Sequence, residues 1–269
     1  MLQLPSTSQM ALWTWPRGLY PGQMHFYFKA EALPLSVLAT PSNPSGSSTI
    51  IPIAVNPKTN RLAAVYPDLE PQPTDSKLPV IKITHPGDKT TRILHQSTAV
   101  VQYLEDYFPP SKGYRDLSGA SSPELRAHVR AIVQLITDAM IWMQCDIFNM
   151  HPFTISLGLC APGKQSAAAS AYARRRWKEE LAKLDRWVQA LDQEKEAISL
   201  AGALEYPTTA DFNLLSAVEL FKDWFDTDVL EGFPALERWY GRYRRSEWWV
   251  ERDAVDRIGE GRYAELFVG

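Results

Sequence analysis

Cysteine is scarce in this chain: Cys145 and Cys160 are the two present among 269 residues. Two cysteines are too few for a disulfide scaffold or for a cysteine-ligated metal site. The histidines, among them His25, His95, His128 and His151, lack metal-ligand spacings such as His-Glu-x-x-His. We therefore expect a reduced, cytoplasmic protein without a metal.

Strong net charge and long apolar runs are also missing. The formal net charge is −3, which gives no electrostatic footprint for nucleic acid. The basic run Arg174-Arg175-Arg176 lies in a Lys/Glu/Arg-rich segment and is interpreted as a solvated helix face. No run reaches the roughly 18 apolar residues of a membrane span, and the N-terminus lacks the order of a signal peptide. We expect neither a nucleic-acid partner nor a membrane span.

The first half of the sequence alternates strand and helix patterns. Strands are predicted at Ala11 to Trp15 and Leu35 to Ala39, with a helix from Gly22 to Ala32 preceded by Pro21. Residues 41–49 form a loop rich in Pro, Ser and Gly. The part that follows is hard to interpret: 50–55 and 62–65 fit short strands or irregular loop, and 66–77 fits an insertion.

The second half is helical in pattern. A linker covers 109–121, and Ser122 with Pro123 and Glu124 marks a helix start. Apolar residues then recur at helical spacing. Further helices are predicted at 165–191, from Thr208 through Phe221, and at 231–243. We therefore expect an α/β domain at 1–109 and an all-α domain at 122–269.

A possible ligand site lies between two predicted strands and the helix after them. Leu78-Pro79 opens the first strand, and Gln96-Ser97 stands where the second strand passes into the helix Thr98 to Phe108. If the bond before Pro79 is cis, the backbone N–H and C=O of Leu78 can face an extended ligand. Ser97 falls at a helix N-terminus, which favours an anion. The pattern indicates a site for a short acidic peptide.

Four motifs in order resemble the cytosolic glutathione S-transferase superfamily, and the resemblance runs from Leu12 to about Trp249. They are Leu78-Pro79, the run LHQSTAVVQYLE at 94–105, PTTAD at 207–211 and GFPALERWY at 232–240. The resemblance implies a thioredoxin-like N-terminal domain, an all-α C-terminal domain, a homodimer, and glutathione as co-substrate or regenerated cofactor.

The resemblance also implies binding roles, position by position. Leu78, before the cis-proline Pro79, would pair its backbone with the cysteinyl part of glutathione. Ser97 would bind the γ-glutamyl carboxylate, and Gln96 would orient the γ-glutamyl amino group. Lys77 is placed to meet the glycyl carboxylate.

The chain departs from the family at the residue that would donate a hydrogen bond to the glutathione thiolate, here called the thiolate donor. Aligned on the first helix, the tyrosine of the animal classes falls on Thr14 and the serine or cysteine of other classes on Gly18. The cysteine of a bacterial class and the asparagine of a fungal class fall on Tyr20. Tyr20 is our first choice, Arg17 the second and Thr14 the third, and backbone amides at 18–23 remain an alternative. For each of the three side chains, a packing or surface role is the competing interpretation.

The resemblance implies an enzyme that adds the glutathione thiolate to a small apolar electrophile. Trp15, Met140 and Met143 are the residues assigned to that substrate, because Met and aromatic side chains suit a bulky apolar molecule. The outcome is either conjugation or cis–trans isomerisation of an activated double bond. The chain is similar to fungal members of natural-product pathways that isomerise polyketide olefins, of the pseurotin/synerazol type. The alternative is a non-catalytic glutathione-binding or regulatory protein of the same fold.

Overall fold

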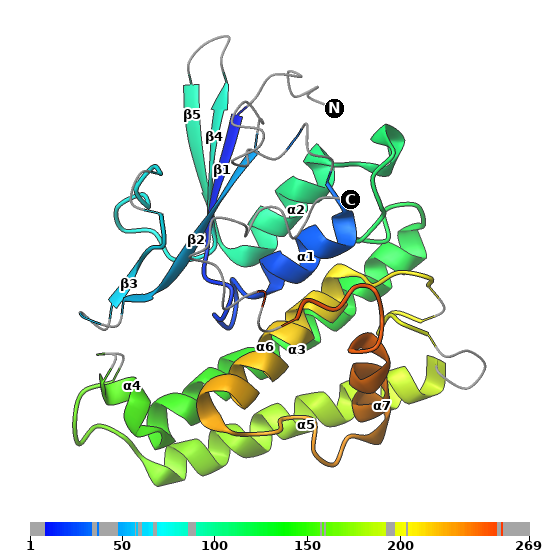
Figure 1. Ribbon diagram of the computed structural model, residues 1–269. Coiled ribbons are helices and arrows are strands. Elements are labelled where there is room, and N and C mark those ends of the chain that lie inside the picture. The colour runs from blue at the N-terminus through cyan, green and yellow to red at the C-terminus, as the bar shows by residue number, and fades with distance from the viewer. Residues whose placement is uncertain are drawn as a thin grey trace. The chain divides into compact units, whose positions relative to one another are not determined.

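A computed structural model describes residues 9–33, 37, 48–56, 58, 61–66, 69–85, 90–156, 158, 160–191, 197–202, 204–251 and 254. The chain divides into two compact units. The first, here called the sheet unit, comprises Met1–Asn56, Leu62–Ser118 and Glu247–Gly269. The second, the helical unit, comprises Pro57–Arg61 and Gly119–Ser246. Figure 1 shows the elements of both.

The described residues of the sheet unit form a five-stranded sheet in the order β3-β2-β1-β4-β5. The central strand β1 (Gln9–Thr14) pairs parallel with β2 (Ser48–Asn56) and antiparallel with β4 (Val80–His85). β4 pairs antiparallel with β5 (Thr90–His95), and β3 (Arg61–Ala64) is the edge strand beside β2. The β2-β1-β4-β5 part is a thioredoxin-like sheet, and β3 extends it by one strand.

The two faces of the sheet are covered differently. Helices α1 (Gln23–Glu31) and α2 (Ser97–Tyr107) lie on one side (Figure 1). Side chains on the other face form a cluster of Trp13, Ile51, Ile53 and Val80, against which Leu69 and Leu78 pack. The indole N–H of Trp13 donates to the C=O of Glu70 at 3.0 Å, and Lys82 pairs with Glu70. The segment after β3 thus covers this face, and its described residues contain no helix.

The helical unit contains two long antiparallel helices. α3 (Pro123–Met150) packs against α5 (Ala167–Leu191) and α6 (Thr209–Phe225), and α7 (Pro234–Tyr243) packs against α5. The short α4 (Pro152–Ser156) follows α3, and a 3₁₀ turn, Pro110–Lys112, precedes α3 in the sheet unit. Ser122 caps α3 as predicted, since its hydroxyl accepts from the N–H of Leu125 at 3.2 Å.

The capping box of α6 is a buried network of hydrogen bonds. The backbone N–H of Thr208 donates to Asp211 at 2.6 Å, as the Thr-Thr-Ala-Asp motif predicts. The N–H of Leu200 (2.7 Å), the hydroxyl of Ser199 (2.9 Å) and the indole N–H of Trp239 (2.9 Å) also donate to this carboxylate. Asp211 therefore links the start of α6 to α7 and to the segment before it.

Several predicted boundaries differ from those observed. The strand expected at 35–39 falls mostly outside the described residues, and the strand that pairs parallel with β1 is β2 at Ser48–Asn56. For 50–55 and 62–65 the sequence leaves short strands and irregular loop open, and the structure has strands there, β2 and β3. The sheet unit extends to Ser118 and includes described residues after Ser246, whereas the sequence predicts domains at 1–109 and 122–269.

One described helix, α3, is long and apolar enough to cross a membrane by length and composition. The sequence had indicated none. Its buried residues include Val129, Ile132 and Ile136, which lie on one face at helical spacing. Packing of α3 against α5 and α6 accounts for that face, so its apolar character is weak evidence for a membrane span.

Candidate functional site

Three strand ends meet at one end of the sheet. Trp13 at the end of β1 pairs with Val80 at the start of β4, and Val80 pairs with His95 at the end of β5. Because β4 runs opposite to both neighbours, the turn after β1, the Leu78–Pro79 pair and Gln96–Ser97 follow directly from these paired residues. The structure therefore brings together the predicted binding motifs and the predicted catalytic turn, and we call this region the strand-end site.

Leu78 presents backbone groups at this site. Its peptide bond to Pro79 is cis, and its side chain packs against the Trp13 cluster. Within the described part of the chain, neither its N–H nor its C=O has a hydrogen-bond partner. The loop before it is held in place: the amide of Gln72 donates to the C=O of Ser76 (2.8 Å), whose hydroxyl donates to Pro73 (2.6 Å). A fixed, unpaired backbone edge can bind an extended chain.

Gln96 has an unusual backbone conformation. Its φ of 74° and ψ of 126° lie where residues other than glycine are rare. Such a conformation costs on the order of 1–3 kcal/mol and is typical of ligand clamps. It lies directly before Ser97, the first residue of α2, and the C=O of Gln96 accepts from Val100 at 3.0 Å.

Ser97 stands where α2 offers free donors. The first N–H groups of a helix have no partner within the helix, and its dipole adds positive potential there. Neither Gln96 nor Ser97 has a side-chain hydrogen bond among the described residues, and the exposed Lys77 has no ion-pair partner among them. These groups leave donors and positive charge available for a carboxylate.

The turn from β1 into α1 leaves no room for a side chain at Gly18. A Cβ there would lie 2.5 Å from Cγ of Pro21 and 2.8 Å from Cε3 of Trp15. The N–H of Gly18 donates to Trp15 at 2.9 Å, and its C=O accepts from Gly22 at 2.8 Å. Close packing of Trp15 and Pro21 thus requires glycine at this position.

The three candidate donors differ in their surroundings. Thr14 is fully buried, and its hydroxyl donates to the C=O of Pro21 at 3.0 Å, so that proton is already engaged. Arg17 and Tyr20 are half-buried in the turn, and both have further interactions within the protein. The C=O of Tyr20 accepts from the amide of Gln23 at 2.8 Å, which fixes the backbone of Tyr20 just before α1.

His25 adds no positive charge to the first turn of α1. The side chain is buried, and burial lowers the pKa of His25 to about 3. The imidazole is therefore neutral near pH 7. Stabilisation of a thiolate at the start of α1 would therefore depend on the turn residues and on the backbone N–H groups of α1.

The three residues assigned to an apolar substrate are mostly packed. Trp15 is half-buried and lies against the Trp13 cluster beside Leu78. Met140 and Met143 have no exposed surface and belong to the core of α3. A substrate wall needs accessible side chains, and the half-buried Trp15, which lies beside Leu78, can supply one at the strand-end site.

Sequence reasoning missed two features that shape this site. The steric need for Gly18 comes from the packing of Trp15 on Pro21, and the bond from Trp13 to Glu70 spans 57 residues. No local sequence motif predicts either contact. Among the described residues, no group of three or more His, Cys, Asp or Glu side chains is arranged to hold a metal ion.

No protein-family model and no curated protein sequence matches the chain. Solved structures do match. A maleylacetoacetate isomerase from Anaeromyxobacter dehalogenans 2CP-1, with bound dicarboxyethyl glutathione and citrate in the active site, is 16% identical. Its TM-score is 0.56, over 91% of each chain.

Two glutathione transferases match similarly. One from Methylobacillus flagellatus KT, with glutathione bound, is 14% identical with a TM-score of 0.59, over 89% of this chain and 97% of that one. The transferase URE2P8 from Phanerochaete chrysosporium, with oxidized glutathione, is 14% identical with a TM-score of 0.58, over 97% of this chain and 98% of that one. The chain therefore has the glutathione transferase fold, a thioredoxin-like domain with a helical one, as the sequence predicted.

Proposed function

We propose that this protein binds glutathione at the strand-end site and directs its thiol at a small apolar electrophile. One observation carries the proposal: the unpaired backbone of Leu78 adjoins the strained Gln96 and Ser97 at the start of α2. An unpaired strand-like segment beside a helix N-terminus suits a short extended peptide with a carboxylate at its end. Structural neighbours that hold glutathione support this choice of peptide.

Glutathione offers a group for each of these protein groups. Its γ-glutamyl carboxylate would accept from the hydroxyl of Ser97 and the first amides of α2, with its amino group at Gln96. The cysteinyl N–H and C=O would pair with Leu78 as an added strand does. Lys77, exposed and adjacent, would meet the glycyl carboxylate.

Replacement of Ser97 tests the site directly. We expect Ser97→Ala and Gln96→Ala each to weaken glutathione binding at least about tenfold, because a hydrogen bond to a charged group contributes about 1.5–3 kcal/mol. Isothermal titration calorimetry measures this. Thr98→Ala is the matched control, since Thr98 is exposed in the same helix turn and has no assigned role. Unchanged affinity in both site variants would exclude this site.

The proposed reaction begins with the glutathione thiolate. The sulfur forms a bond to an electron-poor carbon of an activated double bond, and the electron pair of that bond moves to the activating group. Protonation gives a conjugate. Rotation about the new single bond and loss of the thiolate instead gives the isomerised olefin and regenerates glutathione. The maleylacetoacetate isomerase among the neighbours is a precedent for the second route on this fold.

Tyr20 is the residue we propose as thiolate donor, with Arg17 as the second choice. We expect Tyr20→Phe to raise the pKa of the bound glutathione thiol and to lower kcat for a model electrophile about 100- to 1,000-fold. Thiolate absorbance against pH measures the first effect and steady-state rates the second. A wild-type thiolate pKa in Tyr20→Phe would remove Tyr20 from this role, and Arg17→Gln would then be compared in the same assay.

A non-catalytic glutathione-binding or regulatory protein is the second candidate. Two observations favour it: Gly18 cannot carry a side chain, and the hydroxyl of Thr14 is engaged by Pro21. Retention on immobilised glutathione with no turnover of any model electrophile, including maleyl-type olefins, would support this alternative. Turnover by the wild type that is lost in Ser97→Ala would exclude it.

A cytoplasmic homodimer that acts in fungal natural-product biosynthesis completes the proposal. Its support is the resemblance of the four motifs and the departure at Thr14 to Tyr20, which fits a specialised substrate better than general detoxification. Light scattering after gel filtration tests the dimer, and polyketide olefins of cis geometry are the substrates to assay first.

A further inference from the structure

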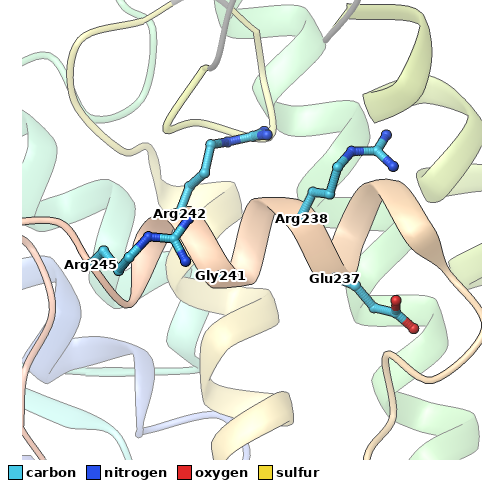
Figure 2. A pocket seen from close by; sticks show the side chains of 5 residues that line it. All are labelled: Glu237, Arg238, Gly241, Arg242 and Arg245. Carbon is cyan, nitrogen blue, oxygen red and sulfur yellow. The ribbon is translucent and has the colours of Figure 1, made fainter.

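A hollow of about 430 Å³ lies along the outer face of α7 in the helical unit. Five of the described residues line it: Glu237, Arg238, Gly241, Arg242 and Arg245 (Figure 2). They recur at helical spacing, opposite the buried face that contains Leu236, Trp239 and Tyr243. We call this the α7 groove. It is separate from the strand-end site, which belongs to the sheet unit.

Gly241 forms the floor of the groove. It is a helix-interior glycine, and glycine there costs stability relative to alanine. The nearest neighbour of an added Cβ would be Nη1 of Arg245, at 3.6 Å, which is ordinary contact. A side chain would therefore fit at position 241. Because the residue is glycine, the space beside the guanidinium of Arg245 stays open.

The lining is strongly positive for a chain of net charge −3. Glu237 is the one acid among the described lining residues; it accepts a hydrogen bond from the N–H of Gly232 at 3.0 Å, and in Figure 2 it points away from Arg242. Nε of Arg242 donates to the C=O of Ala197 at 3.0 Å, so this side chain is anchored. Arg245 is exposed, and its side chain has no ion-pair partner among the described residues.

Arginines near a helix C-terminus also stabilise the helix dipole, which accounts for positive charge at this end of α7. The dipole does not account for a concave surface with a glycine floor. Arg238 and Arg242 lie within α7, and Arg245 lies in the turn just after the helix ends at Tyr243. Three guanidinium groups on one concave surface can bind a small molecule with more than one anionic group.

We propose that the α7 groove binds a small polyvalent oxyanion, a diphosphate or a di- or tricarboxylate, with Arg245 and the anchored Arg242 as principal contacts. Guanidinium groups bind both kinds of anion through paired N–H donors. Binding here is independent of glutathione, because no groove residue belongs to the strand-end site.

Titration with inorganic pyrophosphate, and separately with citrate, tests the proposal on the full chain at low ionic strength. We expect saturable binding to the wild type and at least a tenfold higher Kd in Arg245→Ala. Arg244→Ala is the matched control. It removes the same charge from the same helix end, but Arg244 lies outside the groove, above the ring of Tyr240. We expect its Kd within twofold of the wild type.

A second variant places a negative charge on the floor. Gly241→Asp should abolish binding of both anions while leaving glutathione affinity and the melting temperature near wild-type values. Binding of pyrophosphate alone would assign the groove to diphosphates, and binding of citrate alone to carboxylates. Equal weakening in Arg244→Ala and Arg245→Ala, or no saturable binding to the wild type, would overturn the proposal.

Discussion

At the scale of single residues, Gly18 shows how packing restricts the chemistry of the strand-end site. We expect Gly18→Ser to supply no new thiolate donor and to destabilise the protein by about 1–3 kcal/mol, because its Cβ would overlap Pro21 and Trp15. Chemical denaturation measures the free energy of unfolding, and a model-electrophile assay measures the rate.

Gly241→Ala is the matched control for Gly18. Its Cβ meets only ordinary contacts, and alanine is favoured over glycine within a helix, so we expect stabilisation by up to about 1 kcal/mol. Wild-type stability of Gly18→Ser would show that the turn can relax. Steric restriction would then no longer explain why position 18 lacks a side chain.

The binding residues were more predictable than the reacting residue, for a physical reason. Gln96 and Ser97 lie where a strand passes into a helix, and that transition is encoded within a few neighbouring residues. The strain at Gln96, with φ at 74°, has no local sequence signal, since Gln carries no preference for that region. The thiolate donor depends on how the turn folds on Trp15 and Pro21, and sequence alone leaves several registers open.

At the scale of elements, α6 depends on Asp211. Asp211 is fully buried and accepts from Thr208, Leu200, Ser199 and Trp239. Asparagine would place an amide donor against these donors. We expect Asp211→Asn to destabilise the helical unit by about 1–3 kcal/mol, because at least one buried donor would lose its acceptor. Thermal unfolding followed by circular dichroism measures the effect.

Asp226→Asn is the control for this prediction. Asp226 ends α6 in the left-handed conformation, with φ at 46° and its side chain exposed, and asparagine tolerates that conformation. Its stability should stay within about 0.5 kcal/mol of the wild type. Similar losses in both variants would mean that α6 responds to charge in general, not to the capping network.

Helices were easier to predict than the second strand for the same local reason. The starts of α3 and α6 are encoded by Ser122 and by the Thr208–Asp211 box, within three residues. β2 contains Pro52, which lacks the N–H of a strand interior, and the sequence before it resembles loop. The pairing of β2 with β1 depends on contacts between strands that are distant in sequence, and the sequence of one strand alone does not predict its partner.

At the scale of the whole molecule, contacts distant in sequence define the sheet unit. Arg115 holds the segment after α2 to α1: its N–H donates to Glu31 at 3.2 Å and its side chain to the C=O of Ala30. Its guanidinium also lies 4.6 Å from the ring centroid of Trp248. Described residues after Ser246, such as Trp248, join the sheet unit through such contacts, which the sequence pattern did not reveal.

These contacts give the sheet unit a pH-dependent stability. Burial, and then the charge of Glu105, raise the pKa of Glu31 to about 8, although the N–H of Arg115 opposes the shift. Burial raises the pKa of Glu105 to about 7. Between the usual carboxyl pKa and about 8, the folded protein therefore holds more protons than the unfolded chain, so stability falls as pH rises through this window.

Replacement of Glu31 isolates this contribution. Glutamine keeps an oxygen that can accept the N–H of Arg115, but it never ionises. We expect Glu31→Gln to match the wild type near pH 5 and to exceed its free energy of unfolding by on the order of 2 kcal/mol at pH 8. Urea denaturation at pH 5, 6.5 and 8 measures the difference, with exposed Glu231→Gln as the control. A difference between Glu31→Gln and the wild type that stays constant with pH would show that Glu31 is ionised throughout, and the contact with Arg115 would then hold a charged carboxylate.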